Sequence, residues 1–357
     1  MSKLDTAPYK GVRDFYPEDQ FIQNYIFQIW RKTVRKYGFE EMDASILEYS
    51  EIYKEKSGEE IVNEQTFSFK DRGDRDVTLR PEMTPTVARM VAGKRRELRF
   101  PLRWYSIPNL FRYEAPQRGR LREHWQLNVD TFGIANTMAD VELITLADSI
   151  LKAFGAKPED YEIRISTLRE DKGDLTNVIA SLNKSGIKNI RIDENLARGQ
   201  AYYTGVVFEF FDTNKENPRS ILGGGRYDNL TALFGDSDLP AVGFGAGDVT
   251  LRDFLETHGL LPEYKPATHL YVIPTDPTLF EKVAGVVSSL RDAGIGVAVD
   301  WTDRRLGDQI KAADKLKIPR ILIIGEDELK TSIFALKELA SGKETRGTLD
   351  EIISALK

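Results

Sequence analysis

The apolar residues between positions 18 and 37 recur at the spacing of an amphipathic helix. In EDQFIQNYIFQIWRKTVRKY they fall on one face: Phe21, Ile22, Tyr25, Ile26, Ile29 and Trp30. Gly38 follows directly and is a natural C-terminal stop for a helix. The sequence therefore predicts a helix over 18–37.

Short runs with strand character follow this helix. QTFSFKD and RDVTLRP flank the charged, glycine-containing turn DRGDR, a pattern that predicts a β-hairpin. RWYSIPNLFRYE and HWQLNVDTFG indicate two more strands, separated by the polar loop APQRGRLR. Farther along, residues 137–154 have helical periodicity. The next segments predict a strand at YEIRIST and a short helix at LTNVIASLNKSG. Two further strands, AYYTGVVFEFFD and SILGGGRYD, are expected to meet at a glycine corner. We expect an antiparallel sheet with helices packed on it.

The pattern changes near LLPEYKPATH, where two prolines and several charged residues interrupt it. Beyond this point strand-like and helical segments alternate as in βαβ units. In order they are HLYVIPT, a helix around 278–293, GVAVDW, a helix around 305–317 and RILIIGEDE. The expected fold class is therefore α+β. We place a first domain at 1–262, a linker at 263–267 and a small α/β domain at 268–357.

Composition and charge narrow the possible functions. The 357 residues are 41% apolar and 30% charged, which is typical of a folded chain long enough for two cores. The absence of cysteine excludes disulfides, thiolate metal sites and a cysteine nucleophile, and three histidines argue against a histidine-rich metal site. A net charge of −6 argues against indiscriminate nucleic-acid binding but allows a local basic groove.

Targeting and membrane-spanning patterns are absent from the sequence. The stretch MSKLDTAPYKGVRD contains no apolar segment of signal-peptide length, and there is no run of about 18 apolar residues. With the missing cysteines, this leads us to expect a cytoplasmic protein that does not contact a membrane.

Four arginines lie in one short stretch, FRYEAPQRGRLR: Arg112, Arg118, Arg120 and Arg122. In an arbitrary surface loop, such charges would most simply be interpreted as a solvated hairpin tip that keeps the protein soluble. The alternative is a phosphate clamp, because a guanidinium group can bind phosphate through two parallel hydrogen bonds. Arg112 and Glu114 are two residues apart on a predicted strand, so we expect them on one face.

Two further stretches carry candidate binding residues. In TLRPEMTPT, Glu82 and Thr84 place a carboxylate beside a hydroxyl, which could hold an α-ammonium group; otherwise this is only a rigid strand exit. In ARGQAYYTGVVFE, Tyr202 and Tyr203 are expected on opposite sides of a strand, one in the core and one in a pocket. The glycines of LGGGRYD permit close backbone approach or a bulge, and match neither a P-loop nor a dinucleotide fingerprint.

The three histidines receive no catalytic assignment. His124 follows the arginine-rich loop, and His258 and His269 fall near the expected domain boundary. Nothing matches a Ser-His-Asp triad in spacing or context.

Taken in order, several segments resemble those of class II histidyl-tRNA synthetases: GVRDFYPED, TLRPEMTPT, FRYEAPQRGRLREHWQLNVD, ARGQAYYTGVVFE, GGGRYD, GFGAGD and the tail RRLGDQIKAADKLKIPRILIIGEDE. The match runs nearly end to end, and so many segments in order are far more specific than any one. The resemblance implies a six-stranded antiparallel catalytic domain, a C-terminal anticodon-binding domain and a homodimer. It also implies that histidine and ATP form histidyl-adenylate and pyrophosphate, after which histidine passes to its tRNA.

The resemblance also implies roles for individual residues. Arg112 and Arg198 would act at the α-phosphate, where Arg112 stabilises the charge that develops as the histidine carboxylate attacks. The expected ATP-binding residues are Arg112, Glu114, Arg120 and Arg226. The expected histidine-binding residues are Glu82, Thr84, Gln126, Asp130, Arg198, Tyr202 and Tyr203. Magnesium is expected on the outer phosphates, with no separate metal site in the protein.

Three departures from the family pattern stand out. Thr250 occupies the third-motif position where family members usually carry an arginine for the γ-phosphate, so that Arg120 or Arg226 would have to supply the charge. Ser45 replaces a usual first-motif proline. The stretch between Asp130 and Arg198 is too short for the family's usual inserted helical domain.

Two functions are therefore weighed. The first is an active histidine–tRNA ligase, favoured by the complete tail and by the retained Arg112, Glu114, Arg198 and tyrosine pair. The second is a catalytically silent paralogue, a histidine-sensing regulatory subunit of ATP phosphoribosyltransferase, favoured by Thr250 and the short middle section. A tRNA-binding scaffold without histidine is a distant third.

Overall fold

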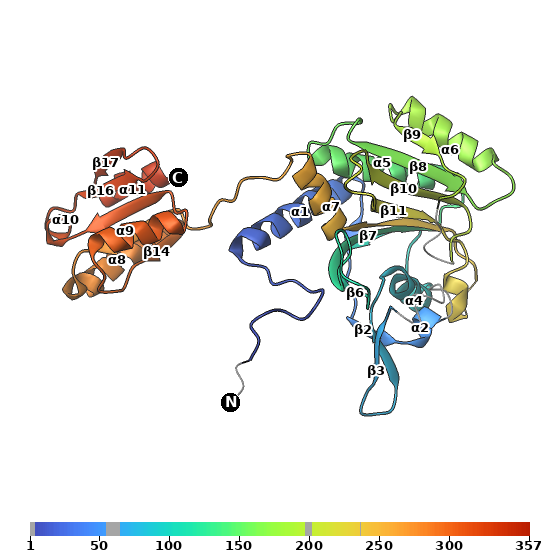
Figure 1. The fold of residues 1–357 in the computed structure, drawn as a ribbon, viewed down its shortest axis with the longest axis horizontal. Coiled ribbons are helices and arrows are strands. Elements are labelled where there is room, and N and C mark those ends of the chain that lie inside the picture. The colour runs from blue at the N-terminus through green and yellow to red at the C-terminus, as the bar shows by residue number, and fades with distance from the viewer. Residues whose placement is uncertain (1–3, 55–64, 197–201, 236) are drawn as a thin grey trace. The chain divides into compact units, whose positions relative to one another are not determined.

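The computed structural model describes residues 4–54, 65–196, 202–235 and 237–357, and the chain divides into two compact units, Met1–Pro262 and Glu263–Lys357 (Figure 1). Each unit has its own hydrophobic core. Among the helices of these residues, none is long and apolar enough to cross a membrane.

The first unit is built on one large sheet. In spatial order its strands are β1 (Glu40–Glu41), β5 (Leu102–Ser106), β7 (Glu123–Phe132), β12 (Ala241–Gly247), β11 (Ser220–Arg226), β10 (Val206–Asp212), β8 (Tyr161–Thr167) and β9 (Ile190–Ile192). The six strands from β5 to β8 are antiparallel to their neighbours, and β1 and β9 add short parallel edges. The expected α+β class with an antiparallel catalytic-type sheet is confirmed.

Smaller elements surround this sheet. The short strand β6 (Asn109–Phe111) pairs with the first residues of β7, and a separate three-stranded sheet has the order β2 (Leu47–Tyr49), β4 (Asp76–Leu79), β3 (Phe67–Lys70). The helices of the described residues in this unit are α1 (Pro17–Lys36), α2 (Glu51–Lys54), α4 (Thr84–Lys94), α5 (Met138–Ala153), α6 (Gly173–Lys184) and α7 (Asp248–Thr257), with a 3-10 turn at Thr231–Phe234.

The main core lies between the sheet and the helices α1, α5 and α7. Ile26, Trp30 and Val34 of α1 are fully buried at a spacing of four residues, which is the helical spacing expected from the sequence. The predicted first helix is confirmed to within one residue, and Gly38, just beyond its C-terminus, has a φ of +77°, where glycine is favoured. The apolar faces of the helices thus cover one side of the sheet and leave the other side for the site.

The predicted hairpin is confirmed by β3 and β4. In its turn, the Asp71 carboxylate accepts hydrogen bonds from the backbone N–H groups of Gly73 and Arg75 at 2.8 and 3.0 Å. This hairpin projects at the bottom of Figure 1.

The prediction of one continuous strand over RWYSIPNLFRYE is wrong. The chain makes two strands, β5 and β6, and both pair with β7. The break falls at Pro108, which has no N–H to donate and whose carbonyl accepts from the backbone N–H of Gln126 at 3.0 Å. Arg112 and Glu114 therefore lie beyond β6 in irregular chain.

The second unit confirms the predicted βαβ pattern. Its elements are β13 (Leu270–Pro274), a 3-10 turn (Pro277–Leu279), α8 (Phe280–Asp292), β14 (Val297–Val299), α9 (Leu306–Lys315), β15 (Arg320–Ile324), α10 (Glu326–Thr331), β16 (Phe334–Glu338), β17 (Glu344–Gly347) and α11 (Leu349–Leu356). β13 is parallel to both β14 and β15. β16 and β17 extend the sheet as an antiparallel hairpin that the sequence analysis did not foresee.

Substituting Gly224 by alanine is expected to destabilise the first unit strongly. A Cβ there would press on the carbonyl oxygen of Gly243 and lie 2.5 Å from the Cβ of Phe244, so that neighbouring backbone must move. We expect a loss of about 1–3 kcal/mol or more in the free energy of unfolding, measured by urea denaturation. As a control, Gly285→Ala on the exposed face of α8 meets no atom within 4 Å and should stabilise by up to about 1 kcal/mol. Equal behaviour of the two variants would contradict this account.

Candidate active site

The middle of the two central strands of the sheet has no side chains on the face opposite the helices. Gly223 and Gly225 of β11 lie directly across from Gly245 and Gly243 of β12. Glycine weakens a strand interior, and its use there is typical of a place where something approaches the backbone closely. These four residues form the floor of the site.

Polar side chains border this floor on both sides. On β7, Gln126, Asn128 and Asp130 alternate with buried Leu127 and Val129, so the polar residues face the floor while the apolar ones enter the core. The close contacts agree with this arrangement: a Cβ at Gly245 would lie 2.5 Å from Nε2 of Gln126, and one at Gly223 would lie 2.9 Å from Cγ of Glu209 on β10. The glycines and their neighbours are therefore matched in size.

Two cavities lie above the floor. The larger, about 590 Å³, is lined on its charged side by Arg112, Glu114, Arg120, Glu209 and Arg219. The smaller, about 90 Å³, includes Glu82, Thr84, Asn128, Tyr202 and Tyr227 in its lining. Both cavities share Arg112, Gln126, Tyr203, Gly223 and Gly245. A small polar chamber thus adjoins a larger basic one, with Arg112 lining both.

Arg112 is held by the backbone around it. Its Nε donates to the carbonyl of Pro81 at 2.9 Å, and its backbone N–H donates to the carbonyl of Arg122 at 2.9 Å. Among the residues that the structure describes, no carboxylate forms an ion pair with Arg112. Its guanidinium is therefore fixed at the junction of the cavities with charge left to offer an anion.

The other arginines of the loop divide between different tasks. Arg120 forms an ion pair with Glu114, and both line the larger cavity. Arg122 instead donates to the Tyr9 hydroxyl at 2.8 Å and lies 4.0 Å from the ring centre of Tyr113, which anchors the N-terminal segment. Arg118 lines a small neighbouring cavity of about 20 Å³.

Two buried hydroxyl–carboxylate pairs involve the lining of the smaller cavity, which includes Glu82, Tyr202 and Tyr227 but not Asp130. The Tyr202 hydroxyl donates to Glu82 at 3.0 Å, and the Tyr227 hydroxyl donates to Asp130. Burial raises the pKa of Asp130 to about 7, although the bond from Tyr227 favours its charged form. Thr84 accepts a long hydrogen bond, 3.4 Å, from the Asn128 amide.

The tyrosine pair departs in part from the expected arrangement. Tyr202 and Tyr203 both line the smaller cavity, and their ring centres lie 5.1 Å apart in an edge-on contact. They precede β10, which begins at Val206, so the alternation of a regular strand does not apply to them. The expectation of one core tyrosine and one pocket tyrosine is confirmed in part, because Tyr202 is 6% exposed and belongs to a hydrophobic core cluster, yet it lines the cavity together with Tyr203.

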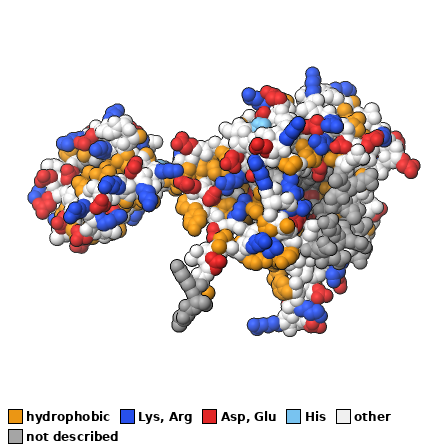
Figure 2. Space-filling model, in the orientation of Figure 1, with side chains coloured by type: hydrophobic (Ala, Val, Ile, Leu, Met, Phe, Trp, Pro, Cys, Tyr) orange, Lys and Arg blue, Asp and Glu red, His pale blue; other side chains and the backbone are white. Residues whose placement is uncertain are grey.

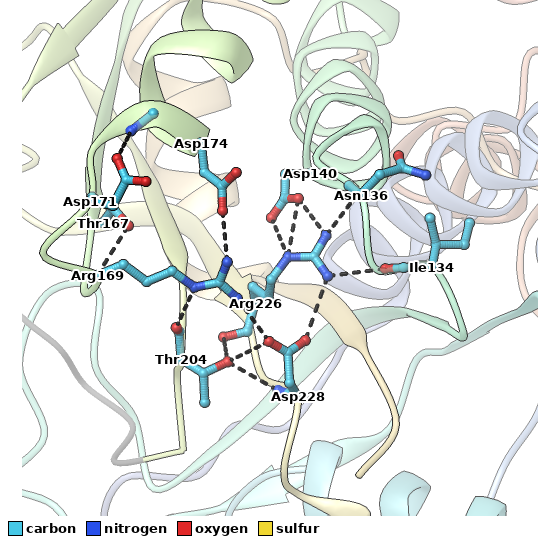
Figure 3. A network of polar contacts seen from close by, with 11 residues as sticks. Ile134, Asn136, Asp140, Thr167, Arg169, Asp171, Asp174, Thr204, Arg226 and Asp228 are labelled. Carbon is cyan, nitrogen blue, oxygen red and sulfur yellow. Dashed lines mark hydrogen bonds and ion pairs between the residues drawn. The ribbon is translucent and has the colours of Figure 1, made fainter.

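Arg226, expected at the ATP phosphates, lies elsewhere. Its side chain is 3% exposed and is held by the Asp140 carboxylate at 2.5 Å and by the carbonyls of Ile134 and Asn136 at 3.0 and 3.1 Å (Figure 3). Asp228 lies 3.5 Å away, and it also pairs with Arg169 at 3.1 Å. Arg226 points from β11 toward the start of α5, opposite the glycine floor, so this expectation is corrected. Arg198 lies outside the described residues.

Sequence reasoning gave no role to three residues of the larger cavity, namely Glu209, His124 and Arg219. Burial raises the pKa of Glu209 to about 7, against the opposing charge of Arg164. Burial and the charges of Arg112 and Arg13 lower the pKa of His124 to about 3, so its ring is neutral at physiological pH. The third is Arg219. A lone glutamate inside the apolar run VVFEFFD could have indicated Glu209; only the fold brings Arg219 to the cavity.

The start of α7 is fixed by Asp248. This fully buried carboxylate accepts from Arg13 at 2.7 Å, from the Gln23 amide at 3.0 Å and from the backbone N–H of Trp125 at 2.9 Å. The first turn of α7, which carries Thr250, is thereby anchored beside the larger cavity.

Metal binding by the protein alone is not supported by these side chains. In the described segments, no group of three His, Asp or Glu residues could hold an ion. The carboxylates of Glu114 and Glu209 suit Mg²⁺ that is bound mainly by phosphates and water.

Comparisons with known proteins agree with this geometry. A family described as histidyl-tRNA synthetase matches residues 11–169 and 159–249, and an anticodon binding domain matches 269–357. A histidine–tRNA ligase of Leptospira biflexa is 39% identical over 428 residues, covering 99% of this chain and 98% of that protein. That alignment is longer than the 357 residues of this chain, so the relative has segments without a counterpart here.

Solved structures share the fold over the whole chain. The apo histidyl-tRNA synthetase of S. aureus superposes with a TM-score of 0.87 at 26% identity, covering 99% of this chain and 100% of that one. A Bacillus halodurans C structure titled ATP phosphoribosyltransferase regulatory subunit/histidyl-tRNA synthetase has a TM-score of 0.71 at 20% identity, covering 91% of this chain and 99% of that one. At that identity it shows a common fold alone.

The antiparallel sheet, the paired cavities on its glycine floor and the anticodon-binding domain define a class II aminoacyl-tRNA synthetase. Within that class, the chain belongs to the histidyl-tRNA synthetase family.

Removing the Arg226 charge is expected to destabilise the fold. Arg226→Ala leaves Asp140 buried without its partner, which should lower the free energy of unfolding by about 3–5 kcal/mol in urea denaturation. The double variant Asp140→Leu/Arg226→Met removes both charges and should be more stable than the single one. Arg103→Ala, which breaks the half-exposed pair with Glu142, is the control and should cost less than about 1 kcal/mol. If Arg226→Ala instead weakened ATP binding without lowering the free energy of unfolding, Arg226 would have to be assigned to the ATP site.

The raised pKa of Asp130 predicts a pH-dependent stability. The folded state keeps the proton up to about pH 7, while the unfolded chain releases it near pH 4, so this group's stabilising contribution is lost as the pH rises through 7. As the pH rises from about 5 to 8, the free energy of unfolding of Asp130→Asn should therefore increase by roughly 2–3 kcal/mol relative to that of the unsubstituted protein. The exposed Asp14→Asn is the control. Parallel stability curves for Asp130→Asn and the unsubstituted protein would refute the assignment.

Proposed function

We propose that this chain activates histidine with ATP to form histidyl-adenylate and pyrophosphate and then transfers histidine to the 3′ end of histidine tRNA. The observation that carries the proposal is the pair of adjoining cavities that share Arg112. The full-length similarity to curated histidine–tRNA ligases supports the choice of amino acid.

The small cavity is proposed to bind histidine. Glu82, a carboxylate that the Tyr202 hydroxyl orients, suits the α-ammonium group, with Thr84 beside it. Gln126 and Tyr203 line the part of the chamber proposed for the imidazole. Asp130 is proposed to act there through Tyr227, which lines the chamber and donates a hydrogen bond to it. Arg198 is proposed, from the family resemblance, to act at the α-phosphate.

The large cavity is proposed to bind ATP, with Glu114 and Arg120 at the adenine and phosphates. An amino-acid carboxylate in the small cavity and an α-phosphate in the large one would meet at Arg112, which lines both. There the fixed guanidinium would stabilise the charge that develops in the attack. Orientation and charge neutralisation can supply most of the acceleration, and no covalent nucleophile is needed. Mg²⁺ would neutralise the outer phosphates when bound, with Glu209 or Glu114 nearby.

The remaining assignments concern partners. We propose that residues 1–262 catalyse adenylation, that 263–267 form a linker and that 268–357 bind the tRNA anticodon. We also propose that the protein acts in the cytoplasm. A homodimer is supported by exposed apolar side chains on and beside the three-stranded sheet: Ile46, Leu47, Tyr49 and Phe69. Hydrophobic side chains gather above the charged tip of the hairpin in Figure 2.

A second candidate is a histidine-sensing regulatory subunit of ATP phosphoribosyltransferase. The observation in its favour is Thr250, whose hydroxyl donates to the carbonyl of Ile221 at 3.2 Å and brings no charge to the cavity. Such a subunit would bind histidine without consuming ATP.

The test is histidine-dependent exchange of labelled pyrophosphate into ATP, with alanine and no amino acid as controls. The unsubstituted protein should exchange with histidine alone, and Arg112→Ala should reduce the rate by about 10²–10³-fold without unfolding the chain. Arg103→Ala, at a residue that lines neither cavity, should exchange normally. Histidine binding without any exchange would favour the regulatory subunit, and near-normal exchange by Arg112→Ala would remove that arginine from the mechanism.

A further inference from the structure

The larger cavity lacks a charge where the family usually has one. The resemblance places an arginine for the γ-phosphate at the position of Thr250, on the first turn of α7. Threonine cannot neutralise a phosphate, so an active ATP site needs a cation from another element.

Arg219 lies beside this position. A Cβ built on Gly119 would be 2.9 Å from Cδ of Arg219 and 3.4 Å from Cγ2 of Thr250, so the Arg219 stem passes between the arginine-rich loop and the start of α7. All three residues line the larger cavity. Arg219 comes from the connection between β10 and β11, far in sequence from both neighbours.

The charge of Arg219 is not compensated nearby. In the part of the chain that the structure describes, no carboxylate forms an ion pair with it. Burial and the charge of Arg120 lower the pKa of the Arg219 guanidinium, and Glu114 only partly offsets them. A cation held half-buried beside a like charge is costly, and a bound polyanion would remove that cost.

Three of the other nearby arginines are engaged. Arg120 pairs with Glu114, and Arg226 with Asp140. Arg252, two residues after Thr250, pairs with Asp19 at 2.8 Å. Arg118 lines the small neighbouring cavity and not the larger one. Among the described residues, Arg219 is therefore the cation beside Thr250 that lines the larger cavity and has no carboxylate in an ion pair with it.

We propose that Arg219 binds the outermost phosphate of ATP and replaces the arginine whose position Thr250 occupies. The inference rests on the proposed function, because it assumes that the larger cavity binds ATP. The required charge is kept, but it reaches the phosphate from the β10–β11 connection instead of from α7.

The test compares binding of ATP and ADP, with Mg²⁺, to the full-length protein by calorimetry. Arg219→Ala should weaken ATP binding by about 10- to 100-fold, because it removes a charged hydrogen-bonding partner, and should change ADP binding much less. Histidine affinity should not change, which shows that the variant is folded. Arg252→Ala, on the same turn of α7 but paired with Asp19, is the control and should bind ATP normally.

A rescue variant tests the shared position. Arg219→Ala/Thr250→Arg returns a guanidinium to the same place and should regain most of the ATP affinity. Equal weakening of ATP and ADP, no weakening in Arg219→Ala, or no recovery in the double variant would overturn the proposal. A chain that binds ATP selectively through Arg219 yet exchanges no pyrophosphate would contradict the proposed function while upholding the role of Arg219.

Discussion

The site depends on the absence of side chains from one face in the middle of β11 and β12. Gly223, Gly225, Gly243 and Gly245 leave the sheet backbone open there, while the opposite face packs against α1, α5 and α7. Glycine in a strand interior lowers the stability of the strand. Burial of the large apolar core on the other face offsets this loss of stability. Because the neighbouring backbones and side chains already fill the space that a Cβ would need, the floor and its polar border are built as one unit.

Arginine performs two opposite tasks in this unit, and its partners decide which. Arg226 and Arg13 form ion pairs with the buried carboxylates of Asp140 and Asp248, so they join distant segments and their charge is compensated. Arg112 and Arg219 face the larger cavity without such partners among the described residues. The same fork-shaped side chain is structural in one setting and keeps its charge available for a ligand in the other.

Much of the fold could be predicted from the chain alone, because periodic patterns report local structure. The first helix, the β3–β4 hairpin, α5 and the βαβ pattern of the second unit were found in this way. The break at Pro108 and the β16–β17 hairpin were missed, since they depend on pairing with strands elsewhere in the sheet. For the site, the motifs led to Arg112, Glu114 and Arg120, which do line one cavity.

The sequence by itself determined the family, the order of the elements and the residue types available for phosphate and amino-acid binding, because these follow from local spacing. Only the tertiary structure decided which charges are free. It placed Arg226 with Asp140 on the far face of the sheet, although GGGR puts it beside the glycine floor in sequence. It also brought Arg219 to Thr250, 31 positions away in the numbering, next to Gly119. Ion pairing and burial are long-range properties, so no local pattern can assign them.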